Sequence, residues 1–135
     1  MSTRAVVAVP FGQPGQWQGT FIHQGGIELA AVVEELLARD GASTVRDMVI
    51  EDSLGWLTLD GKTTQQIPWG YSPREIAPVP GYGLAYTINC AKPMVSSKEV
   101  RWDIEHIHII NKDDTVSSYW VDPLTGEVVP REKVG

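Results

Sequence analysis

The sequence lacks the features that define several classes of protein. It has a single cysteine, Cys90, so no disulfide can form within the chain, and a reducing compartment is expected. No apolar run approaches the roughly 20 residues that cross a bilayer. Residues 1–4 lack the charged and then apolar order of a secretion signal. We therefore expect a cytoplasmic protein with no membrane partner.

Signatures of catalysis and of nucleic-acid binding are also absent. The chain has no Gly-x-Ser-x-Gly, Walker, His-Glu-x-x-His or Cys-x-x-Cys motif, which favours a non-enzymatic function. The net charge is −6, whereas nonspecific binding to nucleic acid depends on clustered lysine and arginine. We therefore expect no nucleic-acid partner. The acidic surface is either a solvated face or one that docks on a basic partner or imitates DNA.

The length and composition predict one globular domain over residues 1–135, with 42% hydrophobic and 21% charged residues. Apolar runs at 4–11 and 17–23 predict two strands joined by a turn at 12–16. An apolar stripe over 27–40 predicts a helix with Gly41 as its C-cap. Thr44 and Asp47 have the spacing of a capping box, which predicts a second helix to about Asp52; a strand over 44–50 is the alternative.

The second half of the chain predicts further strands around an irregular segment. A short strand is expected within 55–61, and the segment 62–98 is expected to be an irregular, Pro- and Gly-rich excursion with one strand at 84–89. Residues 100–110 and 115–121 predict a hairpin with a turn at 111–114, and a short strand is expected at 127–129. Together these elements predict an α+β fold, an antiparallel sheet with one or two helices packed on one face.

Two histidines form the clearest candidate metal site. On a strand, His106 and His108 point to the same face, which is one way to present two nitrogen ligands to zinc. The further ligands that zinc needs would come from a set of four residues elsewhere in the chain: His23, Cys90, Glu28 and Glu99. The alternative is two partly buried histidines that are hydrogen-bonded in the sheet.

A second candidate site consists of Arg4 and His23. Arg4 is the only formally charged residue between Met1 and Ile27, and such an arginine usually pairs with a carboxylate, a carbonyl or an anionic ligand. Only an unusual register of the first two strands would place Arg4 and His23 at the same end of the hairpin. The candidate site therefore does not depend on a contact between them.

Aromatic residues supply the candidate contact surface. The chain has five tryptophans, and this residue anchors protein interfaces and stacks on nucleobases. Trp102 and Trp120 are expected in the core, because they lie on paired strands. In the excursion, Trp69 and Tyr71 are the best candidates for an exposed contact, and Tyr82 is a third.

The start of the chain resembles a group of small, essentially uncharacterised proteins of phages and mobile elements. These typically begin Gly/Ser-Thr-Arg and carry His-Trp-Asp-Gly-Tyr-Pro at the end of the second strand. Here the chain has Ser2-Thr-Arg-Ala5, and His23 and Gly26 match the histidine and glycine of that motif. The hairpin over 104–121 is also similar to their last hairpin. The resemblance implies a phage or mobile-element origin and an α+β fold, with Arg4 and His23 as shared site residues.

These observations lead to one principal hypothesis and three alternatives. The principal one is an accessory protein that binds a defence or regulatory protein of a bacterial host in the cytoplasm, without catalysis and without a cofactor. The first alternative is a protein that sequesters a small, nucleotide-like anionic ligand, with Arg4 on the anion and an aromatic ring on the base. The others are a metal-dependent enzyme that uses His106 and His108, and a component of the virion. A homodimer is compatible with all four.

Overall fold

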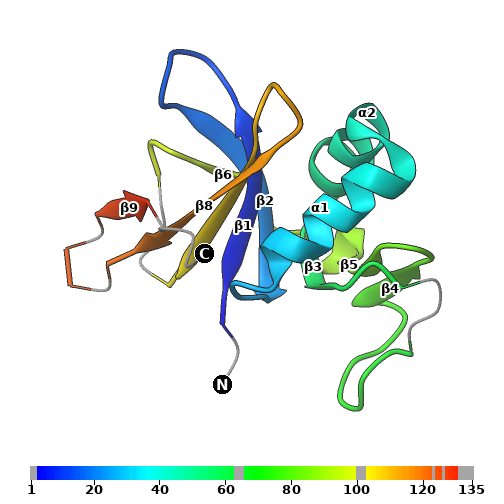
Figure 1. The fold of residues 1–135 in the computed structure, drawn as a ribbon. Coiled ribbons are helices and arrows are strands. Elements are labelled where there is room, and N and C mark those ends of the chain that lie inside the picture. The colour runs from blue at the N-terminus through cyan, green and yellow to red at the C-terminus, as the bar shows by residue number, and fades with distance from the viewer. Residues whose placement is uncertain (1–2, 63–65, 100–102, 123, 126, 131–135) are drawn as a thin grey trace.

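A computed structural model describes residues 3–62, 66–99, 103–122, 124–125 and 127–130 of the chain. Within them, a mixed sheet of nine strands carries the helices on one face (Figure 1). The strands are β1 (Ala5–Pro10), β2 (Trp17–Gln24), β3 (Trp56–Leu59), β4 (Ile76–Val79), β5 (Gly83–Tyr86), β6 (Val95–Ser96), β7 (His106–Ile110), β8 (Val116–Val121) and β9 (Val128–Pro130). They lie in the order β4-β5-β3-β2-β1-β7-β8-β9, and β6 also pairs with β2.

The predicted α+β class is confirmed, but the sheet is not antiparallel throughout. Strands β2 and β3 run parallel, and so do β1 and β7. The chain between β2 and β3 passes through the helical segment, and such a crossover returns a strand in the same direction as the one it left. The prediction placed helices between these two strands but did not draw from them the parallel direction of the second strand.

The helical segment consists of α1 (Leu29–Asp40), α2 (Ala42–Val45) and the π-helix η1 (Arg46–Glu51). Gly41 ends α1 as predicted: it has a φ of 86°, and its N–H donates to the Leu37 carbonyl at 3.0 Å. The predicted capping box at Thr44 does not form, because α2 already begins at Ala42 and has no side-chain cap. Helical geometry from Ala42 to Glu51 also rules out the alternative of a strand over 44–50.

The C-terminal hairpin is confirmed over β7 and β8, which pair antiparallel from His106 with Trp120 to Ile110 with Val116. Strand β7 is shorter than predicted, because residues 103–105 are not in a strand; residues 100–102 lie outside the described part of the chain. The segment 62–98 is more regular than predicted. It contributes β4, β5 and β6, and a short 3₁₀ helix, η2 (Ile88–Cys90), follows β5.

The alternation of side chains along the strands creates two apolar layers. On the helix face, Val7 and Ile22 pack with α1 residues such as Leu36 and with Trp56. The Trp56 indole N–H donates to the Val49 carbonyl at 3.0 Å and so satisfies a carbonyl at the end of η1. On the other face, a second cluster includes Val6, Trp17, Phe21, Leu57 and Ile107. Both faces of the central strands are therefore buried, as parallel pairing requires.

Candidate functional site

Arg4 and His23 lie opposite each other at one end of the β1–β2 hairpin, which corrects the predicted register. Strand β1 pairs with β2 from Pro10 with Trp17 to Ala5 with Ile22, and the next pair along is Arg4 and His23. An unusual register is not needed, because an antiparallel hairpin places the start of its first strand opposite the end of its second strand.

Arg4 has a carboxylate partner within the protein. Its Nε lies 3.7 Å from Oδ2 of Asp103, and the Arg4 side chain is 38% exposed. Of the partners considered for this arginine, the structure therefore supplies a carboxylate. The Arg4 carbonyl also accepts the N–H of Glu105 at 2.9 Å, which brings the segment before β7 against β1.

The pKa of His23 reflects these surroundings. Burial lowers it below the ordinary value of 6.5, the positive charges of Arg4 and Lys92 lower it further, and Asp103 acts in the opposite direction. The His23 ring also lies edge-on to the Phe21 ring, with the centroids 6.1 Å apart. His23 is therefore held in its neutral form more strongly than an isolated histidine.

We expect Arg4→Gln to raise the pKa of His23 toward 6.5, because the change removes a positive charge and leaves Asp103 nearby. An NMR titration of the His23 ring protons measures this, with Arg46→Gln as the matched control. A His23 pKa that is the same in both variants would contradict the assigned electrostatics.

The same shift predicts a pH dependence of stability. The folded-state pKa of His23 lies below the unfolded-state value of 6.5, so its contribution is present above pH 6.5 and is lost as the pH falls through the folded-state pKa. We expect His23→Gln to flatten this part of the pH profile in urea denaturation. An unchanged profile would show that His23 does not contribute.

His106 and His108 share one face of the sheet, as predicted, and this is the face that carries the helices. They do not present two available nitrogens. Their rings stack with centroids 6.1 Å apart. His108 is fully buried; its Nε2 lies 2.8 Å from the Gly26 carbonyl, and its Nδ1 lies 2.8 Å from the Ser118 hydroxyl. A carbonyl only accepts, so Nε2 donates to Gly26, and Nδ1 forms the second hydrogen bond with the Ser118 hydroxyl.

This geometry argues against the proposed zinc pair. A metal on His108 would break one of its two hydrogen bonds. His23 alternates with Ile22, whose side chain packs on the helix face, so the His23 side chain lies on the opposite face of the sheet. Within the described residues, no three His, Cys, Asp or Glu side chains gather as a metal site requires. The alternative to a metal site was a histidine that is hydrogen-bonded in the sheet, and His108 has this environment.

We expect His108→Ala to destabilise the fold by about 3 kcal/mol or more, because it leaves the buried Gly26 carbonyl unsatisfied and opens a cavity. Ser118→Ala removes only the second hydrogen bond and should cost about 1 kcal/mol. Urea denaturation measures both values. Equal losses in the two variants would show that the bond to Gly26 is not the main contribution.

Trp69 is the most exposed aromatic side chain in the described residues, with its entire surface accessible. It occupies a turn in which the Tyr71 N–H donates to the Pro68 carbonyl at 3.2 Å and Gly70 has a φ of 96°. A positive φ at this third position defines a type II turn and favours glycine there. The sequence Pro-Trp-Gly-Tyr therefore forms a turn that holds the indole away from the protein.

A second turn follows directly and fixes the first one to the sheet. The Glu75 N–H donates to the Ser72 carbonyl, and the Glu75 carboxylate accepts the Ser72 N–H, both at 3.0 Å. The Arg74 carbonyl accepts from the Thr87 hydroxyl and from the Asn89 amide. In Figure 1, the green loop before β4 extends away from the sheet. The hydrogen bonds of residues 72–75 therefore hold the turn at 68–71 in place.

Tyr82 lies in a different environment from Trp69 and Tyr71. It is buried, its hydroxyl donates to Asp40 at 2.8 Å, and its ring lies under the Arg39 guanidinium, 5.5 Å from the centroid. Arg39 also donates to the carbonyls of Gly61 and Gly81. These contacts connect the end of α1 to the loops around β4. They give Tyr82 a structural role in the fold.

The prediction that Trp120 belongs to the core is wrong. Its side chain is 51% exposed, although it pairs with His106 on β7 and with Val129 on β9. Pairing with a strand on each side therefore does not bury this side chain. Trp102 lies outside the described residues.

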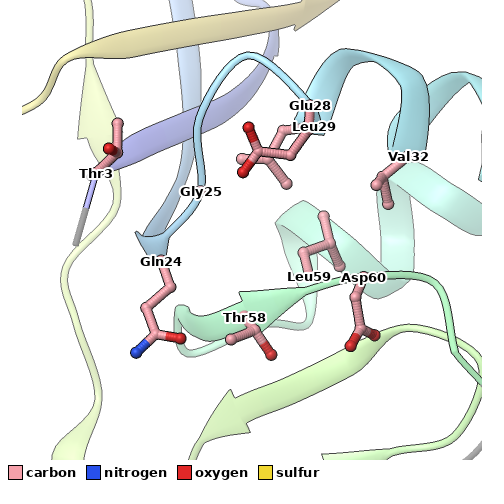
Figure 2. Close-up of a pocket in the computed structure, with 9 residues that line it drawn as sticks. All are labelled: Thr3, Gln24, Gly25, Glu28, Leu29, Val32, Thr58, Leu59 and Asp60. Carbon is pink, nitrogen blue, oxygen red and sulfur yellow. The ribbon is translucent and has the colours of Figure 1, made fainter. Parts of the chain in front are cut away.

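A cavity of about 560 Å³, which the sequence did not indicate, opens where β2 and β3 end. Figure 2 shows it between the β2–α1 loop, the start of α1 and β3. Its lining residues are Thr3, Gln24, Gly25, Glu28, Leu29, Val32, Thr58, Leu59 and Asp60. The sequence signal was the Gly25-Gly26 pair between a strand and a helix. It points to a site only once β2 and β3 are known to be parallel, because ligands often bind beyond the carboxyl ends of parallel strands.

Comparison with protein families, with curated proteins and with solved structures finds no match to this chain. The resemblance to phage and mobile-element proteins stays a prediction. None of the helices in the described residues has the length and apolar composition to cross a bilayer. The fold defines the chain as an α+β protein.

Proposed function

We propose that this chain is a non-catalytic binding protein that contacts another protein through its β3–β4 loop, with Trp69 as the central anchor. The observation that carries the proposal is the complete exposure of Trp69 on a turn closed by a hydrogen bond. Tryptophan is among the residues most enriched at the energetic centres of protein interfaces.

The free energy available from this side chain is large. An aromatic residue of this size buries roughly 200 Å², which at about 25 cal/mol per Å² corresponds to about 5 kcal/mol before the costs of association. In the free protein Trp69 contributes none of this to folding, because its surface is wholly accessible. A partner that covers the indole would gain most of it.

The local structure of the loop lowers the cost of binding. Two consecutive hydrogen-bonded turns, at 68–71 and 72–75, already fix the backbone around Trp69. A side chain presented on a preformed turn loses less conformational entropy on association than one on an unstructured segment. The loop is therefore suited to rigid docking.

Neighbouring residues extend the contact surface. Tyr71 is 38% exposed, and Ile88 is exposed between the two residues that hydrogen-bond to the Arg74 carbonyl. The region 61–98 carries four basic residues and one acidic residue, in contrast to the acidic chain as a whole. The complementary partner surface has an apolar pocket for the indole and acidic residues near it.

We place this partner among the defence or regulatory proteins of a bacterial host and the interaction in its cytoplasm. The resemblance of residues 2–26 to phage and mobile-element proteins supports that assignment. The alternative of a nucleotide-like ligand has less support, because Arg4 pairs with Asp103 and the carboxylates of Glu28 and Asp60 line the cavity.

The test is an affinity purification from host cells with the wild-type chain and with Trp69→Ala, followed by measurement with the purified partner. We expect the partner to be lost with Trp69→Ala and its affinity to fall about thirtyfold or more, as for an interface hot spot. Tyr71→Ala should weaken binding less, because its side chain is less exposed.

The matched control is Phe11→Ala. Phe11 is also an exposed aromatic residue, at 63%, but it lies in the β1–β2 connection. Its replacement should leave binding unchanged. Full binding by Trp69→Ala, or equal losses in Phe11→Ala and Trp69→Ala, would reject the β3–β4 loop as the contact surface.

A further inference from the structure

We propose that the cavity at the ends of β2 and β3 binds a linear aliphatic di- or polyamine, independently of the Trp69 loop. The proposal rests on three features of the cavity: its size, the sign of its charges and the order of its polar and apolar walls. At about 560 Å³ it lies within the range typical of small-molecule sites.

Every charged residue that lines the cavity is acidic. Glu28 lies at the start of α1 and Asp60 follows the end of β3, so the two carboxylates come from different walls. In Figure 2 the Glu28 carboxylate points into the space below the β2–α1 loop. Among the described residues, none forms a hydrogen bond or an ion pair with the Glu28 carboxylate, whereas Oδ1 of Asp60 accepts the Lys62 N–H at 3.1 Å.

Between the two carboxylates the wall is apolar. Leu29, Val32 and Leu59 line this part of the cavity, and Figure 2 shows the Leu59 side chain between Glu28 and Asp60. A methylene chain packs on such a wall, while ammonium groups at its ends meet the carboxylates. The order of charge, apolar surface and charge matches that of an aliphatic diamine.

The remaining polar groups complete the recognition of ammonium. Thr3, Thr58 and Gln24 also line the cavity, and their side chains carry oxygens that can accept hydrogen bonds from N–H donors. An ammonium has three donors and no acceptor, so several oxygens around each end are favourable. Anions are disfavoured, because they would meet two carboxylates and no basic side chain in the lining.

The experiment is an NMR titration of the ¹⁵N-labelled chain with spermidine and with 1,4-diaminobutane at physiological ionic strength, together with calorimetry. We expect saturable shifts of the Gln24, Gly25 and Thr58 amides. Butane-1,4-diol, which has the same chain length without charge, should give none. Diffuse shifts that do not saturate would overturn the proposal, since they indicate nonspecific attraction to an acidic protein.

Matched variants distinguish binding in the cavity from attraction to the net negative charge of the protein. Glu28→Gln should weaken spermidine binding about tenfold or more, the cost of losing a charged hydrogen-bond partner. Glu35→Gln removes the same charge from an exposed position on the same helix and should have no effect. Thr58→Lys places an ammonium in the cavity and should abolish binding. Equal affinity of the Glu28→Gln and Glu35→Gln proteins would overturn the proposal.

One further arm distinguishes the source of the ammonium. Nα-acetyl-lysine amide represents a lysine side chain of another protein and is titrated in parallel. Tighter binding of this compound than of 1,4-diaminobutane would overturn the free amine as occupant. Trp69→Ala should bind spermidine normally, so the outcome is independent of the proposed function.

Discussion

The hydrogen bond from His108 to the Gly26 carbonyl connects the sheet to the helical segment. His108 lies on β7, and Gly26 lies in the turn between β2 and α1, so one 2.8 Å contact holds the start of the helical segment on the sheet. Gly26 is buried, and a buried carbonyl without a donor is costly. The adjoining Gly25 N–H donates to the Thr3 carbonyl at 2.7 Å, which fixes the same turn to the chain just before β1.

The geometry of this turn determines the cavity beside it. A Cβ atom on Gly25 would overlap the Leu29 side chain and crowd Ile22, so only glycine permits this close approach of α1 to the end of β2. With Gly25 and Gly26 in place, Glu28 lies at the start of α1 and lines the same cavity as Asp60. The stability of the helix–sheet contact and the shape of the candidate amine site therefore depend on the same few residues.

Local sequence patterns predicted the elements that local interactions form. The stripe of α1, its glycine C-cap and the β7–β8 hairpin all follow from periodicity and turn chemistry within a few residues. The parallel pairs depend on connections between distant segments, which no short pattern encodes. Trp120 shows a further limit, because alternation gives the face of a residue but not whether another element covers that face.

The fold accounts for some of the tryptophans and not for others. Trp56 is buried and its indole N–H satisfies the Val49 carbonyl, and Trp17 packs in the second apolar layer, so the fold accounts for both. Trp69 makes no such contribution. The turn around it is closed by backbone hydrogen bonds that another residue at this position would also permit, and its indole is wholly exposed. The proposal that a second molecule covers Trp69 therefore depends on the enrichment of tryptophan at the energetic centres of protein interfaces, and not on the fold.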